Sequence, residues 1–276
     1  MPANKKYKDT VFTSLFNDKK RLLELYNAIE GTSYTNPNLV EINTLSGVLF
    51  TNRRNDISFI IDGKIVVLVE HQSSINENMP FRMLLYCARS YEMITTKKDI
   101  YRQSLIKIPR PEFIVFYNGK AKFPEQKTLK LSDAFIQTNS KGKRLSSLEL
   151  EVRVVNINKG HNVSILRKSK TLSAYSDFIA KVREFESKDC KIEEAIRKAI
   201  SYCIGKGILR DYLRKHSSEV VNMLLATEFN MEDAIAVAKE EGEAKGEVKG
   251  MKKLLALWEK GVPLAEAKRK LGLVRR

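Results

Sequence analysis

Three polar side chains stand at the ends of two apolar runs, with residue types that suit a divalent metal ion. Asp56 precedes the run Ile57–Ile61, and Glu70 and Gln72 follow the run Ile65–Val69. Both runs are short and rich in β-branched residues, which is typical of buried strands. A carboxylate at the end of such a strand must be hydrogen-bonded, protonated or bound to a cation. A metal ion is the interpretation that explains the most residues, because divalent ions such as Mg2+ take oxygen ligands.

The turn between the two runs decides whether the carboxylates meet. The Asp-Gly dipeptide at 62–63 predicts a hairpin. In a two-residue turn Ile61 pairs with Lys64, and side-chain alternation then sends Asp56 and Glu70 to opposite faces, so the site fails. In a three-residue loop with a glycine bulge, the pairing shifts by one residue and the two acids become diagonal neighbours on one face, with roughly 7–8 Å between their backbone positions. We therefore predict the bulged hairpin.

These residues resemble the PD-(D/E)xK nuclease superfamily, and within it the recombination-promoting nuclease (Rpn) and transposase-like family. The resemblance extends roughly over residues 7–118. It is carried by KDTVFTSLF (8–16), NDISF with Asp56, VEHQ with Glu70, MPFRMLLY (79–86) and FIVFYNG (113–119). It implies a restriction-endonuclease-like α/β fold and a DNA endonuclease that depends on Mg2+ or Mn2+ held by Asp56 and Glu70, with water as the nucleophile. It further implies a role in recombination, transposition or defence against mobile DNA.

The superfamily pattern ends in lysine, where this chain has Gln72, as this branch of the superfamily does. An amide orients a water or a substrate oxygen but supplies no positive charge, so neutralisation falls to the metal and to nearby arginines. Taken singly, Asp56 is also a common turn residue and Glu70 a common salt-bridged strand residue. Two alternatives to the nuclease stay open. The fold can be retained without catalytic rate, as a basic DNA-binding or toxin–antitoxin partner, or the C-terminal helices can serve as an interaction scaffold.

Composition restricts the class of protein. The 276 residues are 43% hydrophobic, which supports a buried core, and no apolar run approaches the 18 residues that predict a membrane span. We therefore expect a cytoplasmic protein without a membrane partner. The three cysteines and three histidines lack zinc spacing, and we expect no nucleotide cofactor. The net charge of +16 favours DNA as the partner, although many lysine-rich proteins bind no nucleic acid.

Two helices flank the predicted hairpin. The first spans about Lys8–Glu30, with a break at Asn17-Asp18, and carries Asp9 and Glu24, which are candidates for an additional acid or for a solvated helix face. The second begins at Asn78-Met79-Pro80 and runs to about Thr95. On it, Arg82 and Arg89 share a face with Tyr86 and Met93 and are candidates for phosphate contacts or for salt bridges. The residues expected to pack on the sheet are Phe81, Leu84, Leu85, Ala88 and Tyr91.

Further strands are predicted at residues 47–50, 112–118 and 149–158, and between the last two the chain is rich in lysine. The nucleic-acid-binding candidates in this loop region are Lys120, Lys122, Lys141, Lys143 and Arg144, with a solvated surface as the alternative. Helices are predicted around 164–187, 192–204, 211–227 and 231–260. Small residues recur at Ala238, Gly242, Gly246 and Gly250, a pattern that lets two helices approach closely or marks a flexible arm.

We accordingly divide the chain into a nuclease-like core (1–160), a helical extension (161–230) and a C-terminal helical tail (231–276). We expect the tail to act as a dimerisation arm and the protein to be a homodimer.

Overall fold

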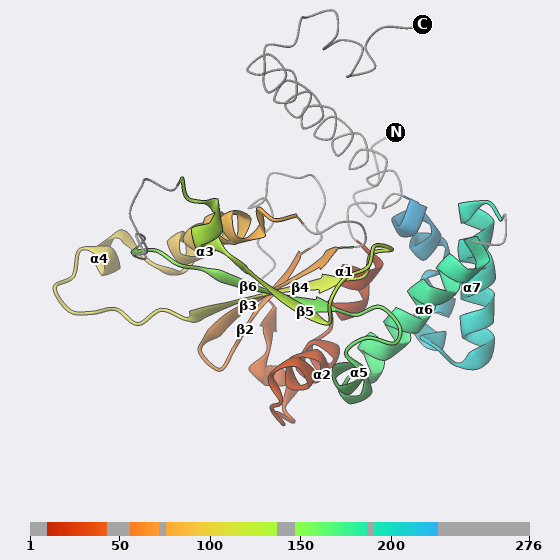
Figure 1. Ribbon diagram of the computed structural model, residues 1–276. Coiled ribbons are helices and arrows are strands. Elements are labelled where there is room, and N and C mark those ends of the chain that lie inside the picture. Colours follow the sequence, from red (N-terminus) through yellow and green to blue (C-terminus); the bar gives the residue numbers. More distant parts are fainter. Residues whose placement is uncertain (1–9, 43–55, 72–75, 137–146, 187–189, 226–276) are drawn as a thin grey trace, which may run out of the picture. The chain divides into compact units, whose positions relative to one another are not determined.

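The computed structural model describes residues 10–42, 56–71, 76–136, 147–186 and 190–225, apart from the side chains of residues 56, 70 and 71. The chain separates into two units, Met1–Thr227 and Glu228–Arg276, and all the described residues belong to the first. In that unit a mixed six-stranded sheet is covered by helices on both faces (Figure 1). No described helix has the length and apolar character needed to cross a membrane.

The sheet has the strand order β1-β2-β3-β4-β6-β5. The pairs β3–β4 and β4–β6 are parallel, and the other three pairs are antiparallel. This mixed sheet with flanking helices confirms the predicted α/β, restriction-endonuclease-like class. The strands are β1 Glu41–Ile42, β2 Asp56–Ile61, β3 Lys64–His71, β4 Arg110–Tyr117, β5 Gln126–Lys130 and β6 Glu151–Asn156.

The β2–β3 hairpin has a two-residue turn, so the predicted bulged hairpin is wrong. Ile61 pairs with Lys64, and the ladder continues to Asp56 opposite Val69. The two turn residues both have positive φ, 50° at Asp62 and 68° at Gly63. Positive φ at both central positions is the mark of a type I′ turn, whose twist matches that of the flanking strands. Aspartate tolerates this conformation and glycine adopts it freely, so the Asp-Gly pair fits the shorter turn without a bulge.

The N-terminal helical segment is broken where the sequence predicts a break. Helix α1 ends at Phe16, and α2 begins at Lys19 with Asp18 as its N-cap, whose side chain accepts a hydrogen bond from the Arg21 N–H at 3.0 Å. The predicted helix at 164–187 is instead two helices, which meet at Ser169. The helices are α1 Val11–Phe16, α2 Lys19–Glu30, α3 Met79–Ile94, α4 Lys97–Ile100, α5 Val163–Lys168, α6 Lys170–Glu186 and α7 Ile192–Lys206, followed by helical residues 210–225.

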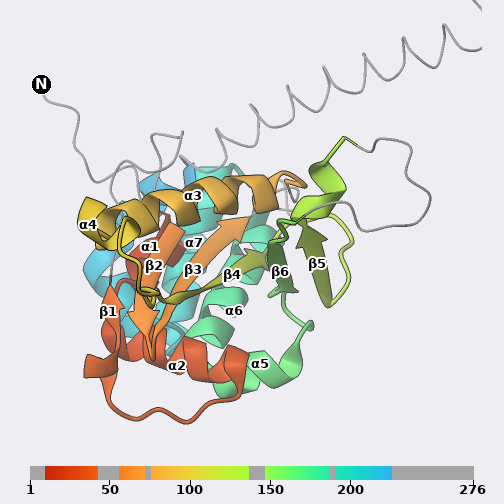
Figure 2. The same cartoon turned by 90° about the vertical axis from the view of Figure 1, so that its left-hand side faces the viewer.

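Strand alternation divides the hydrophobic core between the two faces of the sheet. Phe59 and Leu68 face the side of α1, α2, α6 and α7, and Phe12 joins these elements by packing on Phe116 and Tyr175, with ring centroids 5.4 and 5.7 Å away. The alternate strand positions face α3 (Figure 2). The helices after residue 160 thus share a core with the sheet. Burial on both faces explains why β3 and β4 read as continuous apolar runs.

Helix α3 packs through a face that only partly matches the predicted one, since Tyr91 packs on the sheet core as predicted. Met83 and Tyr86 are buried against the sheet, whereas Phe81 is 51% exposed and Ala88 is also exposed. The sequence pattern misled because α3 is apolar around most of its circumference, so helical spacing alone does not select a face.

The stretch predicted as a lysine-rich loop contains β5, an edge strand in which only Leu129 is buried. The predicted strand at 47–50, the helix at 231–260 and the row from Ala238 to Gly250 lie outside the described residues.

Candidate functional site

One edge of the sheet collects the ends of the central strands. Strands β3, β4 and β6 are parallel, so their carboxyl ends meet there, and the antiparallel β2 begins there. In the ladder Glu70 pairs with Phe116 and His71 pairs with Tyr117, which in turn pairs with Asn156. Polar residues at strand ends are therefore brought together from three separate parts of the sequence.

Asp56 and Glu70 both lie at this edge. Asp56 is the first residue of β2 and stands opposite Val69, so Glu70 is one rung further along. A regular ladder assigns positions 56 and 70 to opposite faces, because paired positions share a face and successive positions alternate. Gln72 lies outside the described residues. The ladder therefore brings the backbones of the two acids close together but does not supply the shared face on which the sequence argument relied.

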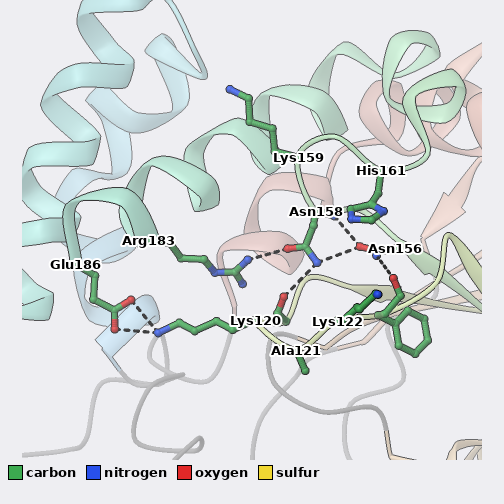
Figure 3. A pocket seen from close by; sticks show the side chains of 11 residues that line it. Lys120, Ala121, Lys122, Asn156, Asn158, Lys159, His161, Arg183 and Glu186 are labelled. Atoms are coloured by element: carbon green, nitrogen blue, oxygen red, sulfur yellow. Dashed lines mark hydrogen bonds and ion pairs between the residues drawn. The ribbon is translucent and has the colours of Figure 1, made fainter. Parts of the chain in front are cut away.

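Next to these strand ends lies a pocket of about 700 Å³, here called the edge pocket. It is formed by the loop after β4, the segment after β6 and the C-terminal part of α6. The residues that line it include Lys120, Lys122, Asn156, Asn158, Arg183 and Glu186 (Figure 3).

A network of asparagines forms the wall of the edge pocket. The Asn156 side chain donates to the carbonyl of Phe123 at 3.0 Å. The Asn158 side chain donates to the carbonyl of Gly119 at 3.1 Å and to the side-chain oxygen of Asn156 at 3.0 Å. The loop after β4 is thus fastened to the segment after β6 by side-chain amides, which hold the pocket wall in one shape.

Arg183 of α6 closes this network. Its guanidinium donates to the side-chain oxygen of Asn158 at 2.7 Å and to the backbone carbonyl of Asn118. It also reaches the side-chain oxygen of Asn118 at 3.4 Å. Arginine only donates hydrogen bonds, so the Asn118 amide must turn its oxygen toward Arg183 and its nitrogen away.

That nitrogen, Nδ2 of Asn118, is buried and has no hydrogen-bond partner in the described part of the chain. Asn118 itself is only 1% exposed. It directly follows Tyr117, which pairs with His71. Asn118 therefore lies one position beyond the last pair between β3 and β4. A buried donor without an acceptor is costly, and an oxygen atom supplied from outside would satisfy it.

Ion pairs surround the edge pocket. Lys120 contacts Glu186 at 2.9 Å, and Figure 3 shows the two side chains meeting beside Arg183. Lys159 points away from the asparagines and pairs with Asp177 at 2.9 Å. Lys122 makes no ion pair with any described residue.

Two pKa shifts belong to this region. Burial raises the pKa of Tyr117, whose hydroxyl donates to the carbonyl of Ala121 at 2.8 Å, so this phenol stays neutral. The backbone N–H of Asn162 and the ring of His161 hold the pKa of the Glu125 carboxyl below its usual range, so Glu125 is an anion.

Glu24, a candidate additional acid, has a structural role at the start of α6. Its carboxylate accepts from the Ser169 hydroxyl at 2.8 Å and from the Thr171 backbone N–H at 2.9 Å. From Thr171 to Arg183 the helix rises about 18 Å, so Glu24 lies far from the sheet edge. The sequence could not reveal this contact, because it joins residues 145 positions apart.

The two candidate arginines of α3, Arg82 and Arg89, lie in different environments. Arg82 is half-buried in the first turn, where its guanidinium contacts the Met79 sulfur at 3.3 Å, and Arg89 is exposed two turns further on. The other candidates, Asp9, Lys141, Lys143 and Arg144, lie outside the described residues.

Sequence reasoning missed Asn118, Asn156, Asn158 and Arg183. The asparagines had a signal, since each stands at or just after the end of an apolar strand, where an amide side chain can fasten loops. Arg183 had none, because an arginine in a helix is usually a solvated residue.

Comparison with known proteins gives one finding. No curated protein and no solved structure matches the chain. The model of a PD-(D/E)xK-type family, described as "Putative transposase, YhgA-like", matches residues 28–189, which is more than half of the chain and includes the strands that carry Asp56 and Glu70. This confirms the resemblance stated from the sequence. The chain belongs to the family of YhgA-like putative transposases.

Proposed function

We propose that this protein is a metal-dependent DNA endonuclease that hydrolyses phosphodiester bonds during transposition, recombination or defence against mobile DNA. The observation that carries the proposal is the family match over residues 28–189, which includes the two strands that bring Asp56 and Glu70 to one sheet edge. The net charge of +16 supports DNA as the substrate, because a basic surface attracts phosphate backbones.

The donor types at the edge, two carboxylates, suit a hard divalent cation, although a regular ladder assigns positions 56 and 70 to opposite faces. Asp56 and Glu70 would hold Mg2+ or Mn2+, both of which take carboxylate oxygens. When bound, such an ion supplies Lewis-acid chemistry, polarising a phosphate oxygen and lowering the pKa of a water molecule. The buried amide nitrogen of Asn118 supports an oxygen-rich ligand at this edge, since it requires an oxygen acceptor.

The chain's own residues would then position the reacting groups. The amide of Gln72 would orient a water or a phosphate oxygen, without contributing charge. Arg183, fixed by Asn158 and Asn118, places a positive charge beside the strand ends, where charge develops on the phosphate.

The two-residue turn places a condition on this mechanism. A shared ion requires side chains to depart from regular alternation at the end of the ladder. Asp56, the first residue of β2, forms the terminal pair there. If alternation persists, the carboxylates stay on opposite faces. The same observation therefore favours a second candidate, a basic protein that binds DNA with little or no cleavage.

Supercoiled plasmid separates the two candidates. The nuclease predicts nicking or linearisation with Mg2+ or Mn2+, none with EDTA, and loss of cleavage in both Asp56→Ala and Glu70→Ala with DNA affinity kept, because phosphate contacts come mainly from lysine and arginine. Calorimetric titration with Mn2+ gives an independent measurement, in which each variant should bind the ion more weakly than the wild type. Unchanged Mn2+ binding and cleavage in either variant would remove that residue from the site. DNA binding without cleavage by the wild type would select the second candidate.

A further inference from the structure

The edge pocket has a fixed wall and a movable cation. The wall is the asparagine network with Arg183, in which the guanidinium is held at 2.7 Å from Asn158. The movable cation is Lys120, which is about half exposed and is paired with Glu186. A solvent-exposed ion pair contributes little to stability. Another anion can therefore displace the Glu186 carboxylate from Lys120 at low cost.

The pocket also offers a cation that needs no displacement. Lys122, two residues after Lys120, lines the same cavity and makes no ion pair with a described residue. Lysine carries its charge on a flexible stem, so both ammonium groups can adjust to an incoming tetrahedral anion. Among the described residues that line the pocket, Glu186 is the one acidic residue, against Lys120, Lys122, Lys159 and Arg183.

We infer that the edge pocket binds a backbone phosphate of nucleic acid, with Lys120 and Lys122 as its contacts and Arg183 as a fixed positive charge behind them. Glu186 occupies the place of the phosphate in the free protein, so binding exchanges one anion for another on Lys120. This inference rests on the proposed function for the identity of the anion as a DNA phosphate. The pocket adjoins the ends of β4 and β6, and β4 pairs with the strand of Glu70, so a duplex held here passes the proposed cleavage site.

The exchange predicts opposite effects for the two members of the ion pair. Lys120→Gln removes a phosphate contact, so affinity for a fluorescein-labelled 20-base-pair duplex should fall roughly three- to tenfold at moderate salt. The slope of log affinity against log salt should fall by up to about 0.9, because Lys122 still contacts the same phosphate. Lys122→Gln should act in the same direction. Glu186→Gln removes the competing anion, so affinity should rise roughly two- to fivefold.

Lys198→Gln is the matched control. Lys198 is as exposed as Lys120 and pairs with Glu194 at 2.7 Å, but it lies on α7 and does not line the pocket. It changes the net charge by the same amount, and its affinity should stay within about twofold of wild type. Fluorescence anisotropy in EDTA measures all four variants without cleavage, and circular dichroism melting shows that each is folded.

The outcomes separate this inference from the nuclease proposal. If Glu186→Gln weakens binding, or Lys120→Gln behaves like Lys198→Gln, the pocket is not a phosphate site, whatever the plasmid assay shows. If the variants follow the expected order while the wild type cuts no plasmid with either metal, the phosphate site stands and the nuclease proposal fails.

Discussion

Replacing Glu24 tests whether this acid belongs to the fold or to the chemistry. The structure places its carboxylate at the N-terminus of α6, where it accepts hydrogen bonds from Ser169 and Thr171. The Ser169 hydroxyl, fully buried, donates to Glu24 and accepts from the Leu172 N–H at 3.2 Å. Glu24 thus completes the cap of a 17-residue helix that packs on the sheet.

The expected loss of stability follows from the hydrogen-bond donors that Glu24→Ala would leave without an acceptor. Loss of a charge-assisted hydrogen bond costs about 1.5–3 kcal/mol, and loss of a negative charge at a helix N-terminus costs about 0.3–1 kcal/mol. These contributions overlap, so we expect the free energy of unfolding to fall by about 2–3 kcal/mol. At about 2–4 °C per kcal/mol for a domain of this size, the melting temperature should fall by roughly 4–12 °C. Glu24→Gln keeps one acceptor oxygen and should lose only about 1 kcal/mol.

Urea unfolding followed by circular dichroism measures these differences. The control is Glu193→Ala, which removes an exposed carboxylate in the first turn of α7, paired with Arg197 at 2.7 Å, and should cost no more than about 1 kcal/mol. If Glu24→Ala is no more destabilising than this control, the capping argument is refuted. If Glu24→Gln stays folded at wild-type stability but loses plasmid cleavage that the wild type has, Glu24 acts in the chemistry instead.

Three further predictions concern the turn, the core and pH. Gly63→Ala should cost about 1–2 kcal/mol because the φ of 68° is strained for alanine, although a Cβ there meets no atom within 4 Å. Gly205→Ala within α7 should instead be neutral or stabilise the protein by up to about 1 kcal/mol. Thermal melts compare the two variants, and equal effects would contradict the backbone argument. Phe12→Ala should cost about 3–5 kcal/mol, since Phe12 is fully buried between Phe116 and Tyr175, and a loss below 1 kcal/mol in urea would show that the core closes around the gap. Glu125→Gln should destabilise at neutral pH: the folded pKa of Glu125 is lowered, so its contribution is present above the unfolded pKa and is lost as pH falls through the folded one. Melts between pH 7 and pH 3 should therefore converge with wild type on acidification, and a constant gap would contradict the assignment.

The strands and the N-terminal helix break were predictable because their signals are local. β-branched runs mark β3 and β4, and Asp18 marks the start of α2 by capping it. The hairpin register was not recovered, because the bulged turn was chosen to satisfy a metal site rather than from the turn residues themselves. Aspartate followed by glycine is the preferred pair for a type I′ turn, and this local signal proved stronger than the functional argument.

The edge pocket could not be predicted, because its parts come from distant places in the sequence. Arg183 meets Asn118 across 65 positions, and Lys120 meets Glu186 across 66. The sequence pattern predicted a helix over 164–187, which includes α6, but carried no information on which strand end its last turns would meet. Such contacts are fixed by the packing of α6 on the sheet, through Tyr175 and Phe178, rather than by any motif.

The position of Arg183 bears on Gln72, the neutral residue that follows β3 in the sequence where the superfamily pattern has lysine. Asn118 lies one position beyond the last pair between β3 and β4. The Arg183 guanidinium donates to its backbone carbonyl. A permanent positive charge therefore lies beside the end of β4, next to the strand that carries Glu70, and it comes from a helix rather than from β3. A guanidinium remains charged at any pH at which the protein folds, whereas a buried lysine loses its charge readily. In the proposed mechanism, supplying the charge from α6 would leave position 72 free for an amide, which would orient an oxygen atom without competing for the proposed metal ion.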